Sequence, residues 1–345
     1  MRLGQWNAFL QATQSPYTED EKPLISLIID SPWLPGAFGI GHLDYYFSPK
    51  TWLDINIQIC RQFPEIVFLP GFWVEYGMAI EPSAFGAKVR WWKDNTPSIE
   101  PMLGEDWQTT HRLKIPDPTT DGLMAVALNM YEKYLPDINA AGYLVKFASA
   151  RGPLALASHL RGVTEFLLDL ELDPDGAKKL LEITTETVIL WLKAQAKVLP
   201  DVEAILLLDD IPGMLSPRHF ERFAYPYLKA VFNEFPGFLK VYHNDANVEP
   251  FMGRLPDLGI DVLNFTHNID IQEIAKKQGG RVCLLGNLPP VSVLVDGSPE
   301  FVGTKTQELV KKAVGQKFIL SAGGGLSPGT PMENLTAIVR AVESI

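Results

Sequence analysis

Short apolar runs alternate with longer amphipathic segments along most of the chain. Nearly every residue in these runs is apolar, and most runs end in polar residues, glycine or proline. The runs are residues 24–30, 65–73, 143–150, 204–210, 237–245, 261–267, 281–290 and 317–325. Continuous apolar strands separated by helical segments are typical of a parallel sheet that is covered on both faces.

The segments between the runs have helical patterns. Residues 173–199 carry apolar residues at helical spacing after an Asp-Pro start, and residues 216–235 open with Ser216 as N-cap and Pro217 in the first turn. Together these units predict an α/β fold, a single (β/α)8 TIM barrel over residues 1–345. An open doubly wound sheet is the alternative. Residues 74–142, after the second strand, are expected to form an insertion over the barrel mouth.

Polar residues follow many of the predicted strands. In a TIM barrel the C-terminal ends of the strands carry the chemistry, so we expect these side chains to converge on one pocket. They are Asp30, Glu75, Arg151, Asp209, Asp210, His243, Asp245, His267 and Asn287. Structural roles compete with this interpretation. Asp209 and Asp210 could cap the turn before Pro212, Asn287 could hold a turn, and His267 could cap a helix or be exposed.

The stretch VYHNDANVEP, residues 241–250, is the most informative of these strand ends. Residues i and i+2 of a strand face the same side, so His243 and Asp245 could both reach one metal ion or one substrate group. A His-x-Asp pair is equally compatible with an internal couple in which the carboxylate orients the imidazole.

Composition and charge narrow the class of protein. The chain has 345 residues, 46% of them hydrophobic, and a formal net charge of −11 without any run of Lys or Arg, which argues against nucleic-acid binding. The N-terminal sequence lacks a signal-peptide pattern, and no apolar stretch is long enough to span a membrane, so we expect a cytoplasmic protein. Two cysteines, Cys60 and Cys283, cannot build a disulfide framework or a multi-thiolate metal site.

Several segments resemble the uroporphyrinogen decarboxylase superfamily, and specifically its cobamide-dependent methyltransferase branch. The stretch His243-Asn244-Asp245-Ala246-Asn247 is similar to the H-x-C-G-N segment of that branch. Four further segments resemble the superfamily in the same order: 151–162, 209–228, 286–302 and 321–341. The resemblance covers residues 140–341 well and implies a TIM barrel.

Several positions differ from the family patterns, and these differences limit which activities we expect. Decarboxylases of the family carry an arginine motif for a polycarboxylate substrate, whereas the first strand here ends in IIDSPWLPGAFG, without arginine. Methyltransferases of the branch hold Zn²⁺ with the histidine and cysteine of H-x-C and a later cysteine. Here Asp245 stands at the first cysteine, and Gly323 or Gly324 at the second. Zinc also accepts carboxylates, so His243 and Asp245 with Glu75 are the candidate ligands. Without a metal, His243 and Asp245 would be an acid/base couple.

The resemblance implies a methyltransferase that moves a methyl group between a small substrate, such as an aryl methyl ether, and a cobamide on a partner corrinoid protein. His243, Asp245, Asp210 and Glu75 are the expected catalytic residues. The expected substrate-binding residues are Asp30, Trp33, Phe72, Trp73, Tyr76, Arg151, His267 and Asn287, and the aromatic ones would suit a flat or cationic substrate. The alternative activity is a metal-free decarboxylase or lyase in which Arg151 holds a small carboxylate. A non-catalytic binding protein is the third reading.

Overall fold

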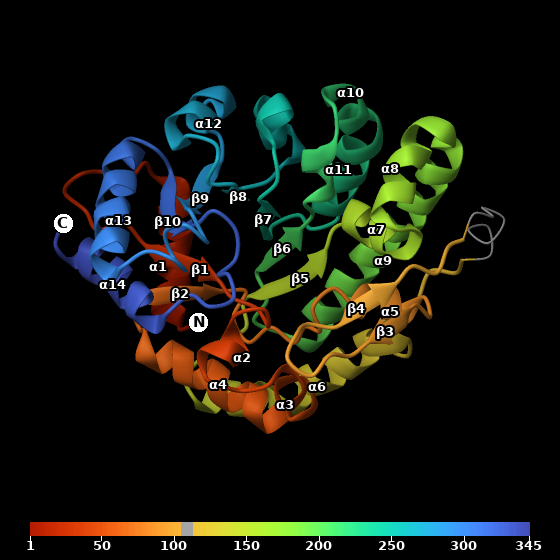
Figure 1. Ribbon diagram of the computed structural model, residues 1–345, viewed down its shortest axis with the longest axis horizontal. Helices are drawn as coiled ribbons and strands as arrows, with labels where there is room; N and C mark the ends of the chain where they lie inside the picture. Colours follow the sequence, from red (N-terminus) through yellow and green to blue (C-terminus); the bar gives the residue numbers. More distant parts are fainter. Residues whose placement is uncertain (105–112) are drawn as a thin grey trace.

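The computed structural model describes residues 1–104 and 113–345, and its centre is a parallel sheet of eight strands curled into a barrel (Figure 1). Each strand overlaps one of the predicted apolar runs. The strands are β1 (Ile25–Ile28), β2 (Ile66–Leu69), β5 (Phe147–Arg151), β6 (Ala204–Leu208), β7 (Leu239–Asn244), β8 (Val262–Phe265), β9 (Cys283–Leu288) and β10 (Phe318–Ala322).

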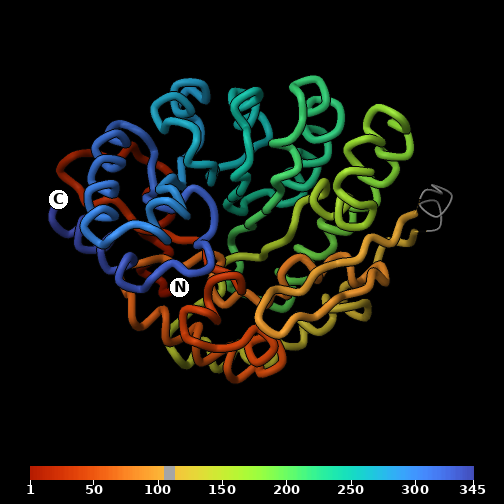
Figure 2. Tube along the Cα trace, in the orientation of Figure 1, coloured from red at the N-terminus to blue at the C-terminus, as the bar shows by residue number. Residues whose placement is uncertain are grey.

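The strand order confirms the TIM barrel. Neighbouring strands pair in the order β2-β1-β10-β9-β8-β7-β6-β5, and every one of these pairings is parallel. Ile25 of β1 lies opposite Leu320 of β10, so the first and last strands are neighbours, which an open doubly wound sheet would not allow. Figure 2 shows the chain circling in sequence order until its last (blue) part lies beside its first (red) part. Among the described residues, no hydrogen-bonded ladder joins β2 to β5, so the barrel is nearly but not fully closed.

Helices surround the strands on the outside of the barrel (Figure 1). The principal ones between and after the strands are α4 (Pro49–Gln62), α7 (Pro153–Arg161), α8 (Val163–Leu172), α9 (Pro174–Val198), α11 (Tyr225–Asn233), α12 (Ile271–Gln278), α13 (Pro299–Ala313) and α14 (Met332–Glu343). Helix α9 matches the predicted segment 173–199. Asp173 caps it by accepting a hydrogen bond from the Gly176 backbone N–H, and Pro174 occupies the first turn.

The segment predicted as one helix over residues 216–235 is divided. A short helix, α10 (Pro217–His219), begins at Ser216, which accepts a hydrogen bond from the His219 backbone N–H. A wider π-turn follows over Phe220–Ala224, and α11 begins at Tyr225. Pro226 lacks an N–H and its ring crowds the carbonyl four residues earlier, which explains the break at this point.

The insertion after β2 is present as predicted. It contains α5 (Ile80–Ala84), a two-stranded hairpin of β3 (Lys88–Arg90) and β4 (Ser98–Glu100), and α6 (Gly122–Ala140). Figure 1 shows the hairpin and α5 beside the end of β5. The insertion therefore supplies residues close to one side of the barrel.

The barrel interior is apolar at the N-terminal ends of its strands. Alternate residues such as Val67, Phe147, Leu206 and Val241 form one buried cluster with Trp6 and Phe9 of α1 (Leu3–Gln14). Trp6 packs edge-on against Phe147 at 5.7 Å, and its indole N–H donates to Glu203. Helix α1 thus closes this end of the barrel and leaves the opposite end for polar side chains. None of the described helices is both long and apolar enough to cross a membrane.

Candidate functional site

Strand alternation aims the polar residues at the C-terminal ends into the barrel. Val241 belongs to the interior cluster, so His243 and Asp245, two and four residues later, face the same side. The same parity brings Arg151 of β5, Asn264 of β8 and Asn287 of β9 to the inner face. The strands therefore gather these side chains at the barrel mouth.

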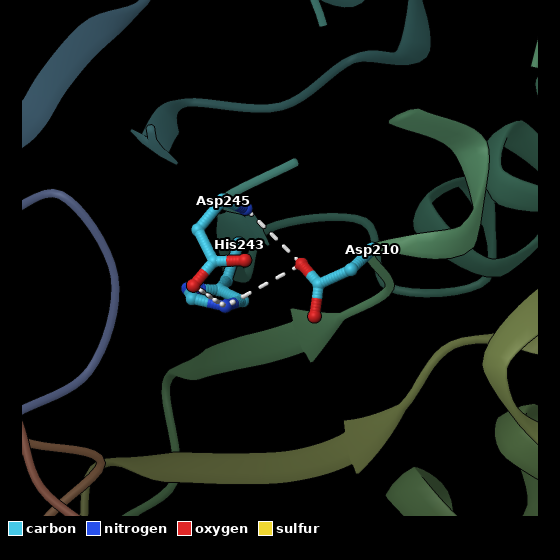
Figure 3. A group of neighbouring side chains, drawn as sticks. All are labelled: Asp210, His243 and Asp245. Carbon is cyan, nitrogen blue, oxygen red and sulfur yellow. Dashed lines mark hydrogen bonds and ion pairs between the residues drawn. The ribbon is translucent and has the colours of Figure 1, made fainter. Parts of the chain in front are cut away.

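Asp210, His243 and Asp245 form a compact group (Figure 3). The Nε2 atom of His243 lies 3.6 Å from Asp210 Oδ1 and 4.0 Å from Asp245 Oδ2. The backbone N–H of Asp245 donates to Asp210 Oδ1 at 3.1 Å, which holds the two carboxylates side by side. The side chain of His243 is only 7% exposed, whereas those of Asp210 and Asp245 are 37% and 43% exposed. The histidine thus forms the floor of the group and the carboxylates form its open rim.

Asn264 orients the His243 ring. His243 Nδ1 lies 2.7 Å from Asn264 Oδ1, and the Nδ2 amide of Asn264 donates to the carbonyls of Leu285 and Ala322. The couple that the sequence left open, with Asp245 orienting the imidazole, is not present because 4.0 Å is too long for a hydrogen bond. The sequence reasoning missed Asn264, although a polar residue inside the apolar run DVLNFTH was a usable signal.

Gly324 lies directly against the Asp245 carboxylate. A Cβ atom added at Gly324 would lie 2.7 Å from Asp245 Oδ2, and the backbone there has a φ of +136°, which favours glycine. Partial burial raises the pKa of Asp245, and the negative charge of Asp210 raises it further, while His243 opposes the shift. The carboxylate therefore occupies the space beside the position at which the sequence resemblance expects a second cysteine.

Asp30 and Glu75 form a second acidic group at the same mouth. Glu75 is buried and accepts hydrogen bonds from the backbone N–H groups of Ser31 and Gly77. Burial raises the pKa of Glu75 to about 7, and the nearby negative charge of Asp30 adds to the shift. Burial also raises the pKa of Asp30 to about 6, while the positive charges of Arg151 and His243 oppose the shift.

Arg151 lies between the second acidic group and the insertion. Its guanidinium stands 5.2 Å above the Trp73 ring and donates to the Gly77 carbonyl at 3.4 Å, and its backbone N–H donates to the buried Glu81. Coulombic attraction to Arg151 lowers the pKa of both Asp30 and Glu75 against the effect of burial. The positive charge of Arg151 is therefore already opposed by carboxylates of the protein.

Glu75 does not join the metal-competent group. Its carboxylate is held by Ser31 and Gly77, and the third ligand atom near His243 and Asp245 comes from Asp210. Of the ligands expected from the sequence, His243 and Asp245 belong to this group, whereas Glu75 does not and Asp210 lies in its place. The physical reason is that two backbone N–H groups turn Glu75 into the fold.

Two predicted aromatic contacts are buried. Trp33 and Phe72 are each 1% exposed, and the Trp33 indole N–H donates to the Thr330 carbonyl. Neither ring presents a surface to a ligand. Trp73 and Tyr76 are also buried, and Tyr76 packs on Tyr46.

Of the remaining strand-end residues, Asn287 and Asp209 hold the fold, and His267 is exposed. Asn287 donates to the carbonyls of Thr266 and Ile269 and holds the loop after β8, as its structural interpretation anticipated. Asp209 accepts from the backbone N–H groups of Leu154 and Ala155, so it caps the first turn of α7 from the end of a neighbouring strand. His267 is exposed in the loop after β8.

The Asp210, His243 and Asp245 group fits a divalent metal ion such as zinc. Ligand atoms each about 2.1 Å from a tetrahedral zinc lie about 3.4 Å apart, close to the 3.6 and 4.0 Å found here. A histidine with an amide partner on its other nitrogen and two carboxylates is an accepted donor set for a catalytic ion. The group could hold an ion and leave an open position toward the mouth.

The fold and this group define a TIM-barrel protein with a metal-competent site at its C-terminal face. The family model described as uroporphyrinogen decarboxylase (URO-D) matches residues 37–345. The chain belongs to the uroporphyrinogen decarboxylase family.

Relatives and solved structures agree with this assignment. A uroporphyrinogen decarboxylase of Coxiella burnetii (strain Dugway 5J108-111) is 29% identical over 312 residues, covering 86% of this chain and 82% of that protein. That of Prochlorococcus marinus (strain MIT 9211) is 32% identical over 180 residues, so the chain spans about half the length of this and other curated relatives. A methyltransferase from Methanosarcina mazei superposes with a TM-score of 0.83 at 21% identity, covering 99% of this chain and 98% of that one. At this identity the similarity establishes the fold.

Proposed function

We propose that this protein is a methyltransferase that moves a methyl group between a small substrate and a cobamide carried on a partner corrinoid protein. The observation that carries the proposal is the group of Asp210, His243 and Asp245, whose ligand atoms converge at the mouth. A bound divalent ion would supply Lewis-acid stabilisation of a leaving or attacking oxygen or sulfur. An aryl methyl ether is our leading substrate class.

The protein's own residues supply the other requirements. A methyl ether or methylamine leaves poorly unless the departing atom gains a proton or a Lewis acid. Asp30, whose pKa is raised toward neutrality by burial, can hold a proton at the opposite side of the mouth. His243 would remain in position because Asn264 holds its ring.

The charge of the mouth argues against uroporphyrinogen itself as substrate. Arg151 is the one arginine or lysine at the C-terminal end of a barrel strand in the described part of the chain. The mouth carries four carboxylates, those of Asp30, Glu75, Asp210 and Asp245, and the charge of Arg151 acts on the first two. A substrate with many carboxylates would be repelled from such a site.

The decisive experiment mixes the purified, zinc-loaded protein with a methylated corrinoid protein and separate pools of methoxyarenes, methylamines and thiols. Methyl exchange with one class, lost in the His243→Ala variant, is the expected result. No exchange with any of the three classes would overturn the proposal.

A small-acid decarboxylase or lyase is the second candidate, favoured by Arg151 at the mouth and by the names of the curated relatives. In this case Arg151 would hold the carboxylate of the substrate. Decarboxylation of small acids by the wild-type protein, with a raised KM in Arg151→Lys, would support this candidate. An active Arg151→Lys variant with unchanged KM would argue against it.

A further inference from the structure

Asn264 is a buried side chain whose hydrogen bonds leave it one orientation. It is fully buried on β8, and its Nδ2 donates at 2.7 Å to the Leu285 carbonyl of β9 and at 3.0 Å to the Ala322 carbonyl of β10. A rotated amide would place its oxygen against two carbonyl oxygens and remove the hydrogen bonds that they accept from Nδ2, which is unfavourable in a buried site. The Oδ1 atom must therefore face His243.

This orientation dictates which nitrogen of His243 carries the proton. The Oδ1 atom can only accept, and it lies 2.7 Å from His243 Nδ1. Nδ1 must therefore be the N–H donor, and in the neutral ring Nε2 holds the lone pair. Nε2 is the nitrogen that faces Asp210 and Asp245.

We propose that Asn264 is a positioning residue that fixes His243 in the Nδ1–H tautomer, so that its Nε2 lone pair is presented to a divalent ion shared with Asp210 and Asp245. The inference rests on the proposed metal-assisted function for its biological meaning. Its physical content, the tautomer and its consequence for metal affinity, does not require methyl transfer.

The mechanism is preorganisation. Asn264 ties β8 to both β9 and β10, so the acceptor for the His243 ring of β7 is itself held in place. Outer partners of metal-binding histidines typically contribute about 10-fold to 100-fold in metal affinity. We expect a loss of that size when Asn264 is replaced.

Asn244 provides a matched control. It is also fully buried in the barrel sheet. Its Nδ2 donates to the Asp209 carbonyl and the Tyr242 hydroxyl, and its Oδ1 accepts from the Ala246 backbone N–H instead of from the His243 ring. Replacement of either asparagine by serine removes a buried amide with two donated hydrogen bonds. Only the Asn264 change removes the acceptor at His243 Nδ1.

The first test is NMR on metal-free protein labelled with ¹⁵N at histidine, near pH 8, where an ordinary imidazole is neutral. The His243 signals, assigned by their loss in His243→Gln, should show a protonated Nδ1 and an unprotonated Nε2. The Nε2–H form, or an average of the two forms, would overturn the proposal.

The second test measures the Kd for Zn²⁺ in each variant. Asn264→Ser should raise it by about 10-fold to 100-fold, and Asn244→Ser should leave it within about threefold of wild type. Equal effects of the two substitutions would also overturn the proposal. If Asn264→Ser does not fold, the wild-type NMR result still decides. Failure of methyl transfer would count against the proposed function and leave both readouts standing.

Discussion

The two acidic groups at the barrel mouth contain similar residues in different environments. Asp210 and Asp245 are 37% and 43% exposed around a histidine held by an amide. Glu75 is buried and satisfied by two backbone N–H groups, next to the half-buried Asp30 and the buried Arg151. Open oxygens with a preset nitrogen can bind an ion, whereas an internally satisfied carboxylate stabilises the fold. The number of carboxylates alone would not have distinguished these roles.

Removal of Glu75 should produce the largest effect on stability. Glu75→Ala removes the acceptor of the buried Ser31 N–H and of the partly buried Gly77 N–H, which should cost about 2 to 4 kcal/mol in the free energy of unfolding. Denaturant unfolding measures this loss. Zinc affinity, measured on the folded variant, should stay near wild type. If Glu75→Ala lost zinc but kept normal stability, Glu75 would be a metal ligand after all.

Neighbouring aspartates provide a sharper contrast. Asp210→Asn removes a proposed ligand and should weaken zinc binding by about 100-fold or more, with little change in stability. Asp209→Asn replaces the cap of α7 and should cost about 1 kcal/mol in unfolding free energy with unchanged zinc affinity. Titration calorimetry and denaturant unfolding on both variants give the comparison. If both variants lost zinc affinity and stability to the same extent, Asp210 could not be distinguished from Asp209 as a metal ligand.

Gly324 tests whether Asp245 needs its present space. Gly324→Ala brings a Cβ to 2.7 Å from Asp245 Oδ2 and should weaken zinc binding by about tenfold. Gly325→Ala is the control, because its Cβ would meet its nearest neighbour at 3.7 Å. Zinc titration of the two variants should separate them, and equal affinities would indicate that Asp245 does not bind the ion.

The pH dependence of stability gives a further comparison. Burial raises the pKa of Glu75 to about 7 and that of Asp30 to about 6, above their unfolded values, so the folded state binds these protons more tightly. Their contribution to stability is present at low pH and is lost as pH rises from about 4 through about 7. The stability of wild type relative to Glu75→Gln should therefore decline over this window. If the stability of wild type relative to Glu75→Gln rose with pH, the raised pKa of Glu75 in the folded protein would be contradicted.

Much of the architecture could be predicted from the sequence. Buried parallel strands are nearly all apolar, so the runs at 204–210 and 317–325 located β6 and β10 directly. Strand periodicity also placed His243 and Asp245 together. Pro226 marked the break before α11 only in hindsight, because proline is also common in the first turn of a helix.

The partners within the site could not be predicted in the same way. The contact between Asn264 and His243 depends on the register of β7 and β8, in which the two residues are directly opposite. Glu75 follows β2 in the sequence just as Asp210 follows β6, and only the backbone turn at Ser31 and Gly77 shows that it faces the fold. Register and turn geometry are long-range properties that composition and periodicity do not contain.

Asp210, His243 and Asp245 are the proposed ligands of a divalent ion at the barrel mouth. Elemental mass spectrometry on protein purified without a metal-affinity step, wild type beside His243→Ala, tests this proposal most directly. We expect zinc or another divalent ion near one per chain in wild type and its loss in the variant. Absence of metal in both proteins, or its retention in the variant, would contradict the proposal.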